Sequence, residues 1–196
     1  FTVFSPSDWK LAKAFVDYSI NVKMPKYLRF DGRPLPLITR AAVKGEEEDL
    51  SSSPYDKVND LVLDKGFYEL LKGENICLVS TGFMTHRALK AAKELQGIGV
   101  IDLFLLKPVD ENSLFEALKK YKYIITIEEG FINNGGLDSL ISKIIRDFQL
   151  NVKMKNLGFN DKHIFEVGDR DYLHKLNGLS EDDIIKTAKN IWTKIL

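Results

Sequence analysis

Two arginines form the clearest candidate for a chemical role in this sequence. Arg29 and Arg33 flank the run Phe30-Asp31-Gly32, directly after a strand-like segment. Two guanidinium groups at the carboxyl end of a strand can hold a phosphate or a carboxylate through charge-assisted hydrogen bonds. A surface ion pair between Arg29 and Asp31 is the alternative interpretation, and the sequence leaves it open.

Two glycine-containing turns follow β-rich segments and precede helical patterns. The first is Ser80-Thr81-Gly82, and the second runs from Glu128-Glu129-Gly130 to Asn133-Asn134-Gly135-Gly136. In an open α/β sheet, ligands bind at such edges, and helix N-termini attract anions. Neither turn matches G-x-G-x-x-G or a P-loop. A structural role, in which glycine permits a tight turn, is therefore the competing interpretation.

Histidine and cysteine do not supply a catalytic set. His86, His163 and His174 are not paired at zinc-ligand spacing, so no metal site is expected. His86 and His174 fall in helical patterns and are expected at the surface or its boundary. The single cysteine, Cys77, lies in an apolar run and is expected to be a buried hydrophobic residue. No catalytic residue is expected in this chain.

Composition excludes several classes of function. Lys and Arg number 28 and Asp and Glu also number 28, and a neutral chain is a poor nucleic-acid partner. No apolar stretch reaches membrane-spanning length, and no signal peptide opens the chain, so no membrane partner is expected. A single cysteine fits a reducing compartment, which favours a cytoplasmic location.

Alternating strand and helix patterns predict the elements that position these residues. An N-terminal strand, a helix capped by Ser5 or Ser7 and a second strand predict a fragment of an α/β domain over residues 1–36. Proline and an acidic run, Glu46 to Asp49, predict a linker over residues 37–65. Strands are expected at 66–71, 75–80, 100–105, 123–127 and 152–157, and helices at 85–95, 108–121, 137–148, 169–176 and 180–195. Residues 66–196 should therefore form an open, mostly parallel α/β sheet with helices on both faces.

Several segments resemble the transketolase family. Residues 5–36 resemble the end of its pyrimidine-binding domain through SPSDWKLAKAF and PKYLRFDGRPLP. Residues from 80 onward resemble its C-terminal domain, in the strings STGFMTHRALKAAKEL, LLKPVDENSL, TIEEGFINNGGLDSLISKII and GFNDKHIFEVGDRDYLHKLNGLSEDDI. Because no initiator Met precedes this pattern, the chain is expected to be part of a longer protein.

The resemblance implies an enzyme that transfers two-carbon ketol units between sugar phosphates. This chain would be its C-terminal portion, which supports the substrate cleft and dimerisation and is not catalytic alone. Thiamine diphosphate and Mg²⁺ would serve the intact enzyme, and no cofactor is expected for this chain alone. The partner would be the rest of the same enzyme or a separate N-terminal subunit, within a homodimer.

The resemblance also carries over to particular residues. Arg29 and Arg33 correspond to the family's arginine pair, whose second member reaches a substrate phosphate, although here the pair is spaced one residue wider. Asn134, Gly135, Gly136 and Leu137 correspond to a dimer contact. Two alternatives stay open: a β-subunit of a 2-oxo acid dehydrogenase, whose pattern Glu128-Glu129-Gly130 also fits, and a non-catalytic assembly module of the same fold.

Overall fold

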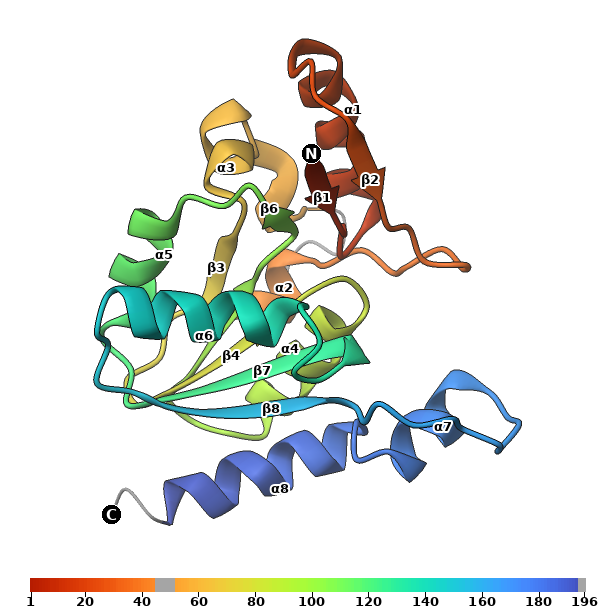
Figure 1. Cartoon of the computed structure of the whole chain (residues 1–196), viewed down its shortest axis with the longest axis vertical. Helices are drawn as coiled ribbons and strands as arrows, with labels where there is room; N and C mark the ends of the chain where they lie inside the picture. The colour runs from red at the N-terminus through yellow and green to blue at the C-terminus, as the bar shows by residue number, and fades with distance from the viewer. Residues whose placement is uncertain (45–51, 194–196) are drawn as a thin grey trace.

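A five-stranded sheet forms the centre of the computed structural model, which describes residues 1–44 and 52–193 (Figure 1). Its strands lie in the order β3-β5-β4-β7-β8. Their bounds are Tyr68–Leu71, Ile98–Asp102, Ile76–Ser80, Tyr123–Phe131 and Lys153–Phe159. Only the β3–β5 pair within this sheet is antiparallel, while the β5–β4, β4–β7 and β7–β8 pairs are parallel. The predicted mostly parallel α/β sheet is confirmed.

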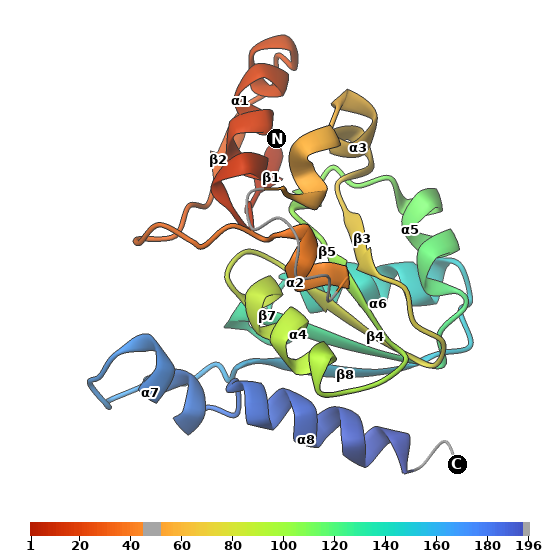
Figure 2. The ribbon, with the colours of Figure 1, turned by 180° about the vertical axis from the view of Figure 1, so that it is seen from behind.

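Helices cover both faces of this sheet because its central strands are apolar on both sides. Within β4, Ile76 and Leu78 join one core and Cys77 and Val79 the other, as the two-residue side-chain period of a strand requires. The first core contains side chains of α4 (Met84–Lys93) and α8 (Glu181–Trp192), and the second contains those of α5 (Glu111–Leu118) and α6 (Leu137–Asp147). Figure 1 shows α6 in front of the sheet, and Figure 2, from behind, shows α4 on the opposite side.

A second, three-stranded sheet joins the N-terminal segment to the rest of the chain. β1 (Thr2–Phe4) pairs in parallel with β2 (Lys26–Leu28) and antiparallel with β6 (Leu105–Lys107). The sequence predicts one strand over 100–105, but the chain leaves the central sheet after Asp102 and enters the second sheet at Leu105. That prediction is wrong because an apolar run reads as a strand without showing which sheet it joins.

The N-cap of helix α1 (Trp9–Asn21) is Asp8, whereas the sequence predicts Ser5 or Ser7. The Asp8 carboxylate, not a serine hydroxyl, accepts from the backbone N–H of Leu11 at 2.9 Å. Ser7 is instead used in a tertiary hydrogen bond, as its hydroxyl donates to Asp102 at 2.6 Å. The predicted caps of two other helices are confirmed: Asp110 caps α5, and Ser180 forms a capping box on α8. The predicted end of the last helix, at 195, lies outside the described residues.

The segment predicted as a linker packs against both sheets. Its described parts form α2 (Arg40–Lys44), a single 3-10 turn, η1 (Pro54–Lys57), and α3 (Asp60–Lys65). Ile38, Tyr55 and Leu63 are buried. The ring of Tyr55 packs edge-on against Tyr68, with 5.9 Å between centroids. The acidic run Glu46 to Asp49 lies outside the described residues. In its described parts, the segment thus contributes to the core, although its composition is that of a surface loop.

Candidate anion-binding site

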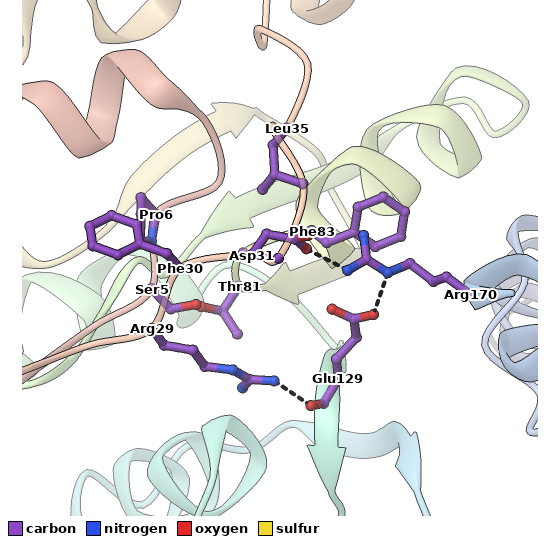
Figure 3. Close-up of a pocket in the computed structure, with 12 residues that line it drawn as sticks. Ser5, Pro6, Arg29, Phe30, Asp31, Leu35, Thr81, Phe83, Glu129 and Arg170 are labelled. Carbon is purple, nitrogen blue, oxygen red and sulfur yellow. Dashed lines mark hydrogen bonds and ion pairs between the residues drawn. The ribbon is translucent and has the colours of Figure 1, made fainter.

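A cavity of about 160 Å³ lies where the carboxyl ends of strands from both sheets meet (Figure 3). Ser5 follows β1, Arg29 follows β2, Thr81 follows β4, and Glu129 lies near the end of β7. Ligands of open α/β sheets bind at this edge. The lining consists of Ser5, Pro6, Arg29, Phe30, Asp31, Gly32, Leu35, Thr81, Gly82, Phe83, Glu129 and Arg170.

Arg29 is a half-buried cation in this cavity. Its backbone N–H donates to the carbonyl of Phe4 at 2.8 Å, which extends the pairing of β1 with β2 and fixes where the side chain starts. Its Nη2 donates to the backbone carbonyl of Glu129 at 2.6 Å. Among residues 1–44 and 52–193, no carboxylate forms an ion pair with it. Most of the five donors of this guanidinium therefore remain available to an anion.

Arg33, the second predicted phosphate ligand, lies elsewhere. Its backbone N–H donates to Oδ1 of Asp31 at 2.9 Å, which forms a local turn. Arg33 is exposed and lines a neighbouring cavity of about 680 Å³, together with His86 and Lys90. The structure thus places the two arginines at different cavities.

Arg170 lies across the cavity from Arg29, and its guanidinium forms ion pairs with two carboxylates. Its Nη2 lies 2.6 Å from Oδ2 of Asp31, and its Nε lies 3.1 Å from Oε1 of Glu129. Its guanidinium also lies 4.2 Å from the centre of the Phe83 ring. The pair Arg29–Asp31, which the sequence leaves open, does not form, because Asp31 pairs with Arg170 instead.

Helix α7 (Arg170–Leu176) is anchored to the cavity through the same carboxylate. His174 is buried, and its Nε2 lies 2.9 Å from Oε1 of Glu129. The expectation of a surface or boundary histidine is therefore wrong for His174. His86 lies at the boundary, as expected: it is partly buried, which lowers its pKa, and its Nε2 donates to the carbonyl of Ser7 at 2.7 Å.

The segment predicted as a dimer contact is partly internal. Leu137 is fully buried in this chain's own core, and Gly136 faces the buried carboxylate of Glu128. A Cβ added at Gly136 would lie 2.5 Å from Oε2 of Glu128, so a larger residue there would require the Glu128 side chain to shift. Burial raises the pKa of Glu128. Of the four predicted contact residues, Asn134 and Gly135 are the exposed ones.

Sequence reasoning missed Asp31, Glu129 and Arg170 as parts of one arrangement. Glu129 belongs to a glycine-containing turn that the sequence does reveal, and Asp169 before Arg170 is a recognisable helix cap. The ion pair between Arg170 and Asp31 joins residues 139 positions apart, and no local pattern encodes it.

Metal-binding clusters and membrane-spanning helices are both absent from the described part of the chain. In residues 1–44 and 52–193, no group of three or more His, Cys, Asp or Glu side chains is arranged to hold a metal ion. No helix there is long and apolar enough to cross a bilayer.

Comparisons with known proteins agree on one family. The family model described as "Transketolase, C-terminal domain" matches residues 68–184. An apulose-4-phosphate transketolase subunit of Actinobacillus succinogenes is 30% identical over 194 residues, which cover 96% of this chain and 56% of that protein. The 1-deoxy-D-xylulose-5-phosphate synthase of Caldanaerobacter subterraneus subsp. tengcongensis is 31% identical over 189 residues, covering 94% of this chain and 28% of that protein.

Solved structures share the fold. A split-gene transketolase, described as an inactive β4 tetramer, superposes with a TM-score of 0.79 at 24% identity, covering 96% of this chain and 57% of that one. The transketolase of Leishmania mexicana superposes with a TM-score of 0.63 at 14% identity, covering 98% of this chain and 25% of that one. The chain thus spans little more than half the length of the Actinobacillus succinogenes protein and of the split-gene chain.

Proposed function

This chain belongs to the transketolase family through its C-terminal domain, and we propose that it is the C-terminal portion of a thiamine-diphosphate-dependent ketol transferase acting on sugar phosphates. It spans 56% of the length of its relative from Actinobacillus succinogenes, whose name describes one subunit of a transketolase. We propose that a separate N-terminal subunit, or the remainder of a longer chain, completes the enzyme.

The observation that carries the proposal is that Arg29 lines the cavity without an ion pair among residues 1–44 and 52–193. Its guanidinium lines a cavity at the carboxyl edge of both sheets, held by a backbone carbonyl at 2.6 Å rather than by a carboxylate. An arginine in this state favours a phosphate, with which it can form paired charge-assisted hydrogen bonds. Arg33 is proposed only as an outer contact, because it lines the neighbouring cavity.

The described residues do not fit a Mg²⁺–diphosphate group. Mg²⁺ takes oxygen ligands from carboxylates, and residues 1–44 and 52–193 contain no cluster arranged to supply them. We therefore propose that thiamine diphosphate and Mg²⁺ bind the other part of the enzyme. This chain would bind and orient the phosphorylated end of the substrate.

The division of the chain follows from the same proposal. Residues 1–36 would belong to a domain that the partner completes, and residues 66–196 would form the C-terminal domain. Residues 37–65 would link these two parts. In support, β2 is an edge strand of its sheet, and the large apolar side chains exposed on and around it are Trp9, Val16, Ile20, Tyr27, Leu28 and Phe30. Exposed apolar side chains of this size support an interface with another part of the enzyme.

We also propose that the complete enzyme is a cytoplasmic homodimer of the two-part unit. The exposed residues Asn134 and Gly135 would lie at its two-fold contact, while Leu137 only supports the loop from within. That a split-gene relative made of β subunits is described as inactive supports the need for a second kind of subunit.

The test is reconstitution of this chain with a separately produced N-terminal subunit of a transketolase. Ketol transfer from a sugar phosphate should appear only in the mixture. Arg29→Ala should raise KM for the phosphorylated substrate about tenfold to a hundredfold, since a charge-assisted hydrogen bond contributes about 1.5–3 kcal/mol. Arg33→Ala is the matched control and should change KM less. Unchanged kinetics in Arg29→Ala, or activity with 2-oxo acids alone, would contradict the proposal.

A further inference from the structure

Thr81 presents a buried hydroxyl without a partner at the candidate site. Its side chain is 3% exposed, and its Oγ1 has no hydrogen-bond partner among the described residues. It directly follows β4 and lines the same cavity as Arg29 (Figure 3). Buried polar atoms in proteins are nearly always hydrogen-bonded, so this hydroxyl requires an explanation.

The helix that follows Thr81 begins without a side-chain cap. Helix α4 has ten residues, and Phe83, at its N-cap position, makes no capping hydrogen bond. The backbone N–H groups of Met84, Thr85 and His86 donate to the carbonyls of the residues three positions before them. Those of Gly82 and Phe83 have no acceptor among the described residues, and the helix dipole adds positive potential there. Gly82 and Phe83 line the cavity, so this helix end faces the same space as the Thr81 hydroxyl.

The charges around the cavity favour an anion at this point. Asp31 and Glu129 also line it, but both are paired with Arg170, at 2.6 and 3.1 Å. These two carboxylates are therefore partly neutralised. Arg29 supplies positive charge and forms no ion pair among residues 1–44 and 52–193, although it interacts at longer range with the buried Glu128. The Thr81 hydroxyl, the backbone of Gly82 and Phe83 ahead of α4, and Arg29 thus line one space.

We propose that Thr81 and the N-terminus of α4 complete, together with Arg29, the seat for the phosphate group of the substrate. The inference rests on the proposed function and assigns part of substrate recognition to the C-terminal domain. Thr81 Oγ1 donates one hydrogen bond to a phosphate oxygen, and the unpaired backbone N–H groups of Gly82 and Phe83 face the same anion. Gly82 keeps the seat open: it has φ +56°, and a Cβ there would lie 3.0 Å from Oγ of Ser5.

The experiment titrates this chain with inorganic phosphate and follows the backbone amides by ¹⁵N–¹H NMR. Saturable shifts are expected at Thr81, Gly82, Phe83 and Met84. Thr81→Val keeps the shape and removes the donor, so it should weaken phosphate binding about tenfold. Thr81→Ser restores a hydroxyl and should bind nearly as wild type. Arg29→Ala should also weaken binding.

Thr2→Val is the matched control. Thr2 is equally buried and its Oγ1 also lacks a partner among the described residues, but it lies within β1 and does not line the cavity. This variant should bind phosphate as wild type does. Its spectrum also shows what removing a buried threonine hydroxyl does to the fold itself.

Three results would overturn the inference. One is phosphate binding that is unchanged in Thr81→Val but weakened in Arg29→Ala. That result would leave the proposed function intact. Another is the absence of saturable shifts at residues 81–84 in the wild type. The third is an equal loss in Thr2→Val and Thr81→Val. Conversely, normal phosphate binding in a reconstituted enzyme that transfers no ketol units would refute the proposed function and keep the anion seat.

Discussion

The hydroxyl of Tyr55 donates a 2.6 Å hydrogen bond to the carboxylate of Asp102, and both side chains are buried. The same carboxylate accepts from the hydroxyls of Ser7, at 2.6 Å, and Thr85, at 2.8 Å. One carboxylate therefore holds together the N-terminal segment, the segment that contains η1, and the C-terminal domain. It lies at the end of β5, one strand away from the cavity-lining end of β4.

Asp102 should make the stability of this chain depend on pH. Burial raises its pKa from 3.8 to about 6, while the three donors act in the opposite direction. Between about pH 4 and about pH 6 the folded chain binds a proton that the unfolded chain does not, so stability falls as pH rises through this window. The loss should be on the order of 3 kcal/mol and complete above pH 6.

Asp102→Asn tests this expectation, since the amide cannot titrate. Urea unfolding measured from pH 4 to pH 7 should show a flatter pH dependence than wild type. The pKa values of Asp8 and Glu128 are also raised by burial and act in the same direction in both proteins. The difference between the two profiles therefore reports Asp102 together with its electrostatic coupling to Asp8, and identical slopes would refute the titration of Asp102 in this window.

Tyr55→Phe should destabilise the chain by about 1.5–3 kcal/mol, because it removes a hydrogen bond to a buried charged group. The matched control is Tyr18→Phe. The Tyr18 hydroxyl donates at 2.8 Å to Asp64, which is exposed, so water can replace that bond and the loss should be below about 1 kcal/mol. Chemical denaturation of both variants at one pH compares them. Equal losses of stability in the two variants would mean that the buried bond from Tyr55 to Asp102 contributes no more than the bond from Tyr18 to Asp64.

Gly136→Ala should cost about 1–3 kcal/mol through overpacking. Its backbone φ of −86° suits alanine, so the cost arises from the 2.5 Å approach of the new Cβ to the buried Glu128 carboxylate. Gly32→Ala is the comparison, because a Cβ there meets nothing within 4 Å. Thermal unfolding should separate the two variants clearly. A wild-type melting temperature for Gly136→Ala would show that Glu128 can move aside.

Arg170→Ala should release helix α7 from the cavity. The variant leaves Asp31 and Glu129 without their guanidinium partner, and the side chain of Asp31 is only 8% exposed. Hydrogen exchange of the amides in 170–176 should accelerate, whereas exchange in α8 should change little. Arg170→Lys keeps the positive charge but not both ion pairs, so hydrogen exchange in 170–176 should be intermediate between wild type and Arg170→Ala. Unchanged exchange in α7 would show that other contacts hold this helix.

The sequence predicts the central sheet well because its signals are local. Ile76, Cys77, Leu78 and Val79 form a continuous apolar run, and such a run is typical of a strand buried on both faces. The capping box at Ser180 likewise marks its helix without any tertiary information.

The errors arise where partners are distant in sequence. Tyr55 lies in a segment whose serines, prolines and acids indicate a loop. Its ring nevertheless packs against Tyr68, and its hydroxyl donates to Asp102. At the candidate site, Arg29 can be identified from the sequence because its position after a strand is local. The pairing of Asp31 with Arg170, which frees Arg29, depends on how the chain folds back over 139 residues.

The antiparallel pairing of β1 with β6 has a consequence for the order of folding. Val3 is paired with Lys107, so the three-stranded sheet cannot form until more than half of the chain has left the ribosome. The strands that β6 follows, β3 to β5, are made before it and can pair among themselves. The apolar side chains of β1 would then stay available to chaperones until β6 has been synthesised.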